Sequence, residues 1–234
     1  MQKSEKELNR IREAYERRKE HVPAGLYSWF NSSALFLHQQ RERNLIDVLK
    51  GNGFDDLSGM VVLDIGCGTG NVLREFIRYG AIPENLHGID LLRDRIDTAM
   101  QISPNIHFTC GDAEQLPYEN NFFDMVILFT VLTSILDDGM KKAVASESLR
   151  VIKQTGVVLY YDYLYDNPKN RDVRGVKKRE IEHLFEGAHI ELARVTLAPP
   201  IARAVAPYSW AACYLLENLK IFNTHYIGTI KKGS

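Results

Sequence analysis

The sequence has few cysteines and no excess of charge of either sign. Its 234 residues include three cysteines, Cys67, Cys110 and Cys213, and none of them forms a C-x-x-C pair. Neither a zinc site nor a disulfide framework is therefore expected, and a reducing, cytoplasmic location is favoured. The formal net charge is -1, so the composition implies no nucleic-acid partner, because proteins that bind duplexes usually carry a basic excess.

A long uninterrupted apolar run is also missing. The longest apolar region, 197–216, contains three prolines and Arg203, which argues against a membrane-spanning helix. The first residues, MQKSEKE, are too charged for a signal peptide. A chain of this length can bury one full core, so we expect one α/β domain with additions.

The chain is organised around the stretch 60–71, which reads MVVLDIGCGTGN. Its β-branched and leucine residues from Val61 to Ile65 predict a strand buried on both faces of a parallel sheet. Three alternating glycines follow, and an apolar pattern at helical spacing resumes from Val72 to Arg78. Glycine permits both a positive φ and the close approach of a ligand to the backbone. The stretch therefore predicts a turn that binds a nucleotide cofactor.

The glycine spacing does not fit dinucleotide binding. In the fingerprint G-x-G-x-x-G the third glycine, counted from Gly66, would fall on Asn71, which speaks against a nicotinamide-dependent oxidoreductase. The residues fit D-x-G-x-G-x-G, with Asp64 at the strand end. This pattern resembles the first motif of the class I S-adenosylmethionine-dependent methyltransferases, of the type 11-like kind. The resemblance implies S-adenosyl-L-methionine as the cofactor and S-adenosyl-L-homocysteine as the product.

Later segments extend the resemblance to residue 162. The segment Leu86–Asp90 reads as a strand that ends in an acid, which can accept both hydrogen bonds of a ribose diol. A third strand begins at Ile106, and in the family an acid at the position of Asp112 accepts from the adenine amino group. Phe123–Phe129 resembles the strand that leads to the reaction centre. The cofactor contacts that the resemblance implies are Asp64, Gly66, Cys67, Gly68, Gly70, Asn71, Asp90, Leu91, Asp112, Ala113 and Phe129.

The fold that the resemblance implies is α/β, a doubly wound, mostly parallel seven-stranded sheet with helices on both faces. We expect residues 1–55 to form an N-terminal helical cap or lid and residues 56–234 to form the cofactor-binding domain. Residues 197–220 are longer and more apolar than a minimal connection, and we expect a substrate-side insertion there. Because the shared sheet handles the cofactor, the cap and the insertion are where substrate choice is expected.

Four side chains are candidates for contact with a substrate. Tyr27 and Trp29 belong to an aromatic cluster ahead of the first strand, for which plain core packing is the alternative. Tyr163 lies in a segment rich in hydroxyls and carboxylates after the fifth strand, and Arg203 lies in the insertion. The basic run 169–179 is either a solvated loop or a contact for a phosphate-bearing substrate or an anionic partner.

Three further residues are candidates for a catalytic role. Asp162 is the first candidate for a proton acceptor, and a carboxylate that binds loop amides is the alternative. Thr130 directly follows the fourth strand, where ligands sit in doubly wound sheets. His38 is a further candidate, although a lone histidine on a helix is often a surface residue. No metal site is expected.

The function that we expect is methyl transfer to a small molecule, with a hydroxyl oxygen as the acceptor, by a monomer or homodimer. Asp162 and the tyrosines near it offer the proton route that a hydroxyl acceptor profits from. A nitrogen or carbon acceptor is one alternative. A module that binds the cofactor without chemistry is another, because methyl transfer requires few catalytic side chains.

Overall fold

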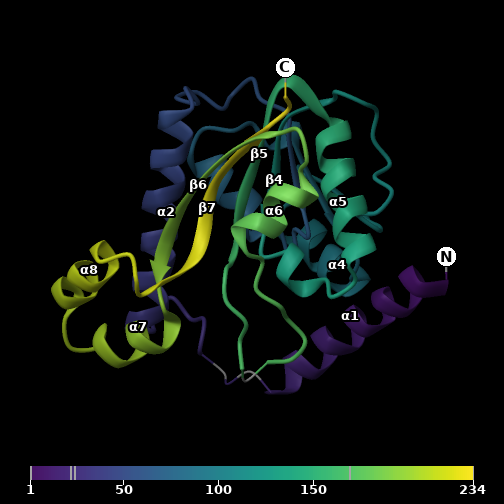
Figure 1. Ribbon diagram of the computed structural model, residues 1–234. Coiled ribbons are helices and arrows are strands. Elements are labelled where there is room, and N and C mark those ends of the chain that lie inside the picture. The colour runs from purple at the N-terminus through teal and green to yellow at the C-terminus, as the bar shows by residue number, and fades with distance from the viewer. Residues whose placement is uncertain (1, 22, 24, 169, 234) are drawn as a thin grey trace.

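A seven-stranded sheet forms the centre of the computed structural model, which describes residues 2–21, 23, 25–168 and 170–233 (Figure 1). The strand order is β3-β2-β1-β4-β5-β7-β6, and β7 runs antiparallel to both of its neighbours. The sheet confirms the expected fold class. The strands are β1 (Val62–Ile65), β2 (Leu86–Asp90), β3 (His107–Cys110), β4 (Phe123–Phe129), β5 (Ile152–Tyr163), β6 (His189–Leu197) and β7 (Asn223–Lys231).

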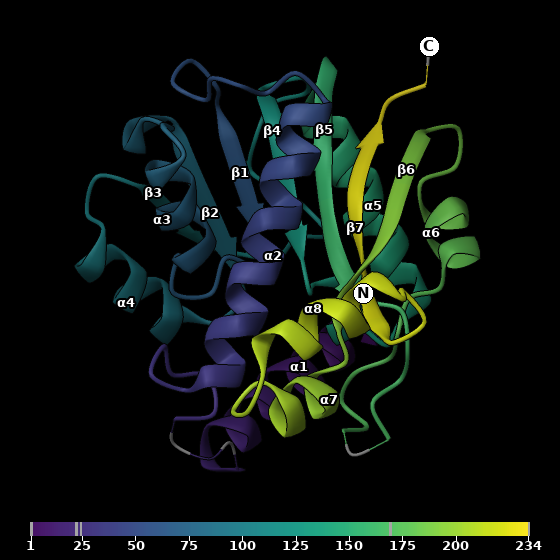
Figure 2. The same cartoon turned by 90° about the vertical axis from the view of Figure 1, so that its left-hand side faces the viewer.

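Helices cover both faces of the sheet. In Figure 2, α2 (Ser32–Gly51), α3 (Asn71–Arg78) and α4 (Arg93–Ile102) lie in front of the strands, whereas α5 (Asp138–Val151) and α6 (Lys178–Leu184) lie behind them. Side chains on successive residues of a strand point to opposite faces. Within β4, Met125 and Ile127 accordingly join the core under α2 and α3, while Val126 and Leu128 join the core under α5. The continuous apolar run in β4 therefore contributes side chains to the cores on both faces of the sheet.

The segment expected as a cap divides into two parts with different surroundings. The helix α1 (Gln2–His21) crosses the lower edge of the sheet in Figure 1, where the parallel strands end. The helix α2 instead belongs to the helical layer, because its Leu45 and Leu49 are buried in the same core as the strands. Of the two helices in residues 1–55, α1 is therefore the one in a position to cover a ligand.

The insertion forms two short helices that pack on the beginning of α2. They are α7 (Pro199–Val205), which starts at the proline pair, and α8 (Trp210–Asn218). Phe36 of α2 is fully buried against them, and the indole Nε1 of Trp210 donates a hydrogen bond of 3.0 Å to Ser32 Oγ. The predicted insertion is thus fixed to the main domain by a small core of its own.

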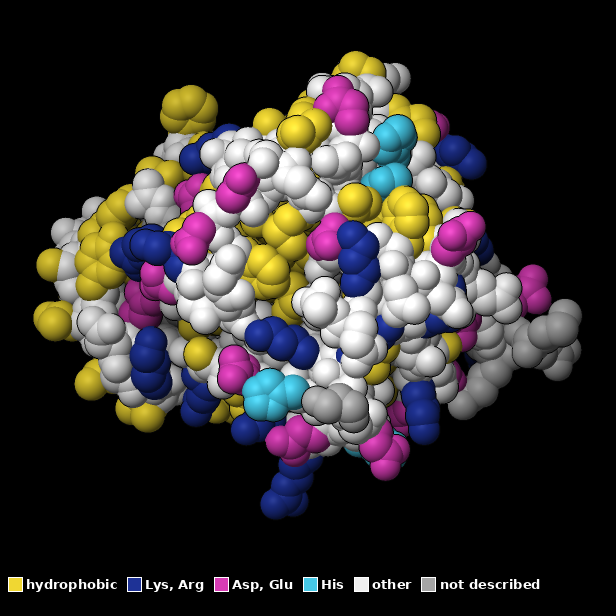
Figure 3. Space-filling model, turned by 90° about the horizontal axis from the view of Figure 1, so that it is seen from above, with side chains coloured by type: hydrophobic (Ala, Val, Ile, Leu, Met, Phe, Trp, Pro, Cys, Tyr) yellow, Lys and Arg dark blue, Asp and Glu magenta, His cyan; other side chains and the backbone are white. Residues whose placement is uncertain are grey.

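Membrane-spanning helices and the charge of one face of the molecule are two further features on which the composition bears. Among the described residues, no helix combines the length and the apolar composition needed to cross a bilayer. Figure 3 shows the face opposite to α1, where Lys and Arg side chains alternate with Asp and Glu side chains and form no patch of one sign.

Candidate active site

The glycine turn has the backbone conformation that its sequence predicts. Gly66, Gly68 and Gly70 have φ of 71°, 55° and 80°, which is the left-handed region that side chains other than glycine rarely adopt. The turn is held against β2, because the amides of Gly66 and Cys67 both donate to the carbonyl of Ile89. A Cβ placed on Gly68 would have Arg95 Nη1, at 3.7 Å, as its nearest neighbour. The space next to Gly68 is therefore open to a ligand.

Asp90, the last residue of β2, links the glycine turn to the end of its strand. The side chain is 8% exposed, and its Oδ2 accepts a hydrogen bond of 2.8 Å from the amide of Gly68. Its Oδ1 accepts one of 2.9 Å from the amide of Leu92. A carboxylate offers about four lone-pair positions, so each oxygen retains one for a ribose hydroxyl. The position of Asp90 is therefore compatible with the ribose contact that the sequence predicts.

Replacing Asp90 with alanine is expected to weaken the binding of S-adenosylhomocysteine by about 1 to 3 kcal/mol, the usual cost of losing a charged hydrogen-bond acceptor. Isothermal titration calorimetry measures this loss. The control is Asp97→Ala on the exposed side of α4, which should leave the affinity unchanged. Equal affinities in the two variants would contradict the ribose contact.

A cavity of about 570 Å³ lies beside the turn, at the ends of β1, β2 and β4. This is a volume typical of small-molecule sites. Six of the expected cofactor residues line it, namely Gly66, Asp90, Leu91, Asp112, Ala113 and Phe129. The other five, which are Asp64, Cys67, Gly68, Gly70 and Asn71, are not among its lining residues. Their predicted contacts with the cofactor stay predictions.

Asp64 lies buried behind the turn. Its side chain is 2% exposed, and its Oδ2 has no hydrogen-bond partner among the residues that the structure describes. Burial, with the nearby charge of Asp90, holds the pKa of Asp64 well above its ordinary value. A positively charged group near the turn would offset both effects. The orphaned carboxylate, the open space at Gly68 and the cavity volume together fit an adenosyl sulfonium ligand.

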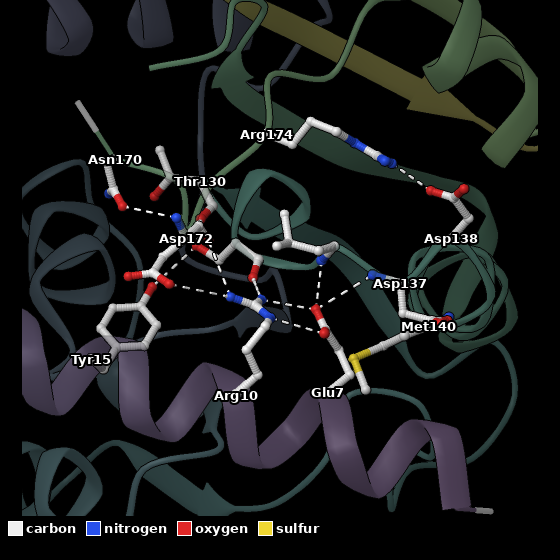
Figure 4. Close-up of polar contacts among 12 residues, drawn as sticks. Glu7, Arg10, Tyr15, Thr130, Asp137, Asp138, Met140, Asn170, Asp172 and Arg174 are labelled. Carbon is white, nitrogen blue, oxygen red and sulfur yellow. Dashed lines mark hydrogen bonds and ion pairs between the residues drawn. The ribbon is translucent and has the colours of Figure 1, made fainter. Parts of the chain in front are cut away.

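The helix α1 lies over this cavity and is fastened to the segment after β4 (Figure 4). Glu7 of α1 is 8% exposed, and its Oε1 accepts a hydrogen bond of 2.6 Å from the amide of Leu136. Arg10 donates from Nη2 to the carbonyl of Ser134 at 2.6 Å and from Nη1 to the carbonyl of Asp172 at 3.3 Å. Although α1 carries many charged residues, it is not surrounded by solvent on all sides. It forms a roof over the cavity, and its Leu8, Ile11 and Tyr15 are among the lining residues.

The attachment of α1 is expected to depend on pH through Glu7. Burial alone would raise the pKa of Glu7, but hydrogen bonds from Arg10 and Leu136 outweigh it and hold the pKa below its ordinary value of 4.5. The carboxylate therefore stabilises the attached helix above pH 4.5, and this contribution is lost as the pH falls further. At neutral pH, Glu7→Gln should speed amide hydrogen exchange in α1 by about tenfold.

The control for Glu7→Gln is Glu20→Gln, an exposed position on the same helix. Hydrogen exchange followed by mass spectrometry compares the two variants with the parent protein. If α1 exchanges at the same rate in all three, Glu7 does not anchor the helix.

A second cavity, of about 600 Å³, lies between α1 and the segment 163–175. Both cavities are lined by Ile11, Tyr15, Arg18, Tyr27, Thr130 and Ser134, so the two spaces meet at these residues. A cofactor in the first cavity and an acceptor in the second would come together there. The structure thereby brings Thr130, Tyr27 and Tyr163, all expected at the site, to the same cavity.

Thr130 occupies the meeting point in a strained conformation. Its φ is 56°, which is unusual for a β-branched residue and costs on the order of 1 to 3 kcal/mol. The amide of Thr130 donates a hydrogen bond of 2.7 Å to the carbonyl of Tyr161, and Oγ1 donates one of 2.7 Å to the carbonyl of Phe129. These bonds hold the turn after β4. Its hydroxyl is engaged with the backbone, so a direct role as a base is not supported.

Asp162 has the surroundings of the alternative considered from the sequence, a carboxylate that binds loop amides, and its role as a proton acceptor stays a prediction. It is fully buried and lines neither cavity. Its Oδ1 accepts from Thr133 Oγ1 at 2.6 Å and from the amide of Tyr163 at 2.9 Å, and its Oδ2 accepts from the amide of Thr133 at 3.1 Å. Burial raises the pKa of Asp162 to about 6, although these hydrogen bonds oppose the shift. Thr133, unlike Asp162, lines the second cavity.

Three further candidates lie outside both cavities. The ring of His38 stacks on that of Trp29, with centroids 4.7 Å apart, and burial lowers the pKa of His38. Neither side chain lines a cavity with Thr130, so the structure does not bring His38 to the reaction centre. Arg203 is exposed on α7 and also lines neither cavity.

Two cations of the basic run 169–179 lie beside carboxylates. Arg174 pairs with Asp138 and lies 3.4 Å from Glu180, and Lys178 lies 3.9 Å from Glu182. Lys169 lies outside the described residues. The contacts favour a structural part for Arg174 and Lys178 over a contact with a phosphate group.

The sequence did not reveal the residues that attach α1, which are Glu7 and Arg10, or the residue after β4 that binds Asp162, which is Thr133. Glu7 and Arg10 belong to a helix whose charges alternate along its length, and nothing in that pattern separates a buried carboxylate from a solvated one. Thr133 was part of a polar segment after β4, but its pairing with Asp162 depends on the alignment of β4 with β5.

Comparisons with known proteins agree with this geometry. Residues 62–156 match the family model described as a methyltransferase domain. The ubiquinone/menaquinone biosynthesis C-methyltransferase UbiE of Idiomarina loihiensis is 36% identical over 116 residues, which cover 45% of this chain and 43% of that protein. A sterol 24-C-methyltransferase of Aspergillus fumigatus is 31% identical over 129 residues, which cover 50% of this chain and 33% of that protein. The chain thus spans less than half the length of these relatives.

Solved structures share the fold at low sequence identity. The cyclase SpnF superimposes with a TM-score of 0.60 at 21% identity, over 83% of this chain and 82% of that one. An S-adenosylmethionine-dependent methyltransferase from Mesorhizobium loti superimposes with a TM-score of 0.58 at 16% identity, over 80% of this chain and 96% of that one. These similarities establish the architecture.

Proposed function

We propose that this chain, whose residues 62–156 form a methyltransferase domain of the S-adenosylmethionine-dependent class, transfers a methyl group to a small-molecule acceptor. The observation that carries the proposal is the open glycine turn beside Asp90, next to a cavity that meets a second cavity at Thr130. The family and the fold imply S-adenosylmethionine as the cofactor.

The cofactor supplies an electrophilic methyl group on a sulfonium, which is a good leaving group. The chain therefore has to bind and align the partners and to exclude water, and alignment alone can account for about 7 to 11 kcal/mol at the extreme. Asp90 and Asp112 would hold the nucleoside, and Asp64 would offset positive charge near the turn. The helix α1 would exclude water, because it covers both cavities.

We further propose that the acceptor atom is a hydroxyl oxygen. Thr133 lines the second cavity, which we call the acceptor cavity, and its Oγ1 donates to the carboxylate of Asp162. This pair can take a proton indirectly: the acceptor hydroxyl gives its proton to Thr133 Oγ1 as Thr133 passes its own proton to Asp162. Asp162 then acts through Thr133 without touching the substrate. With a pKa of about 6, Asp162 is ionised at neutral pH and able to receive the proton.

The alternatives predict different acceptors or no turnover. Two relatives with sequence similarity are carbon methyltransferases by name, which favours a carbon acceptor as the second candidate. A chain of this fold is named as a cyclase, so the fold alone does not establish methyl transfer. Release of S-adenosylhomocysteine with hydroxylated, amino and activated-carbon acceptors separates these possibilities.

Titration with S-adenosylhomocysteine and with NAD tests the identity of the cofactor, and tighter binding of NAD would overturn the proposal.

A further inference from the structure

Arg18 differs from three other cations of α1. Arg10, Arg17 and Lys19 each form an ion pair with a carboxylate. Arg18 instead donates a hydrogen bond of 3.1 Å from Nη2 to the hydroxyl of Tyr27, and its guanidinium lies 5.7 Å from the centroid of the Tyr27 ring. Among the described residues, no carboxylate lies within ion-pair distance of Arg18. Its charge faces the point where the two cavities meet.

The half-buried Tyr163 lines the acceptor cavity together with Tyr27. Burial raises the pKa of Tyr163, and the positive charge of Arg18 acts in the opposite direction. Two guanidinium groups of α1, those of Arg17 and Arg18, belong to residues that line the same cavity.

The acceptor cavity holds little negative charge to balance them. Asp172 is the one carboxylate among its lining residues in the described part of the chain. It is already occupied, because Arg17 Nη2 lies 2.9 Å from its Oδ1 and Arg10 Nη1 lies 4.0 Å from the same atom. The charge of Arg18 is thus left for a ligand.

We propose that the methyl acceptor carries a carboxylate group, which Arg18 binds with help from the hydroxyl of Tyr27. The planar fork of a guanidinium matches a carboxylate in shape and charge. The aromatic rings of Tyr27 and Tyr163 flank the same space and suit a flat acceptor body. This inference rests on the proposed function, since it names the substrate class of the same site.

The test uses matched pairs of hydroxylated acids and their amides on the protein saturated with S-adenosylhomocysteine. The pairs are salicylate and salicylamide, mandelate and mandelamide, and lactate and lactamide. Calorimetry should show that at least one acid binds about tenfold more tightly than its amide, as expected for a charge-assisted hydrogen bond. Arg18→Gln should remove most of that preference, whereas Arg18→Lys should retain part of it. Arg12→Gln, at an exposed position of α1 outside both cavities, should keep it.

Two results would overturn the inference and leave the proposed function intact. One is binding of S-adenosylhomocysteine to the parent protein with no acid preferred over its amide in any pair. The other is a loss in Arg18→Gln of affinity for S-adenosylhomocysteine but not for methylthioadenosine, which lacks the amino-acid group; Arg18 would then serve the cofactor's carboxylate. Failure of the parent protein to bind S-adenosylhomocysteine would instead refute the proposed function.

Discussion

Replacing Gly68 with valine is expected to abolish cofactor binding in a protein that still folds. Gly68 has a φ of 55°, and the nearest atom to a Cβ at this position is Arg95 Nη1 at 3.7 Å. The valine side chain therefore meets little protein, but it occupies the space in which the ligand would approach the turn. We expect the affinity for S-adenosylhomocysteine to fall by at least about a hundredfold, which corresponds to about 2.7 kcal/mol.

A matched control separates the loss of this space from backbone strain. Gly53 follows α2 with a φ of 79°, and a Cβ there would meet nothing within 4 Å. Gly53→Val should therefore cost a similar amount of stability, on the order of 1 to 3 kcal/mol, without affecting the cofactor. Thermal unfolding and calorimetry of both variants distinguish the two effects. The glycine turn would not be the binding site if Gly68→Val bound the ligand as tightly as Gly53→Val.

Replacing Asp162 with asparagine is expected to lower the rate of methyl transfer by about 10² to 10⁴-fold, the usual contribution of a general base. The reason is that asparagine cannot receive the proton that Thr133 passes on. In the parent protein the pKa of Asp162 is about 6. The rate should therefore be high above pH 6 and fall as the pH drops through that value and the carboxylate becomes protonated.

Variants of Thr133 test whether the hydroxyl is the link. Thr133→Val removes the hydroxyl with little change in size and should resemble Asp162→Asn in its rate. Thr133→Ser keeps the hydroxyl and should retain most of the activity. The pH profile is the decisive measurement, because a purely structural role for Asp162 would lower the rate without removing the dependence on pH. Turnover by Asp162→Asn that matches the parent protein at every pH would rule out the relay.

The fold and the cofactor side of the site could be predicted because they depend on local patterns. Strands buried on both faces read as continuous apolar runs, and a left-handed turn requires glycine where the chain reverses. The positions of Gly66, Asp90 and Asp112 around one cavity then follow from the parallel order of β1, β2 and β3.

The acceptor side could not be predicted because it is assembled from segments far apart in the chain. Whether Asp162 faces a cavity or the turn after β4 is decided by its alignment beside β4, and the turn donates to it from both the amide and the hydroxyl of Thr133. The role of Arg18 depends on which of its neighbours on α1 find carboxylates. These ion pairs depend on how α1 packs on the rest of the domain, so they cannot be predicted from the sequence of the helix alone.

The position of α1 would couple the exchange of the two ligands. Because Ile11, Tyr15 and Arg18 of this helix line both cavities, a movement of α1 would widen both cavities together. Such a movement would then be a conformational step that donor and acceptor share in each catalytic cycle.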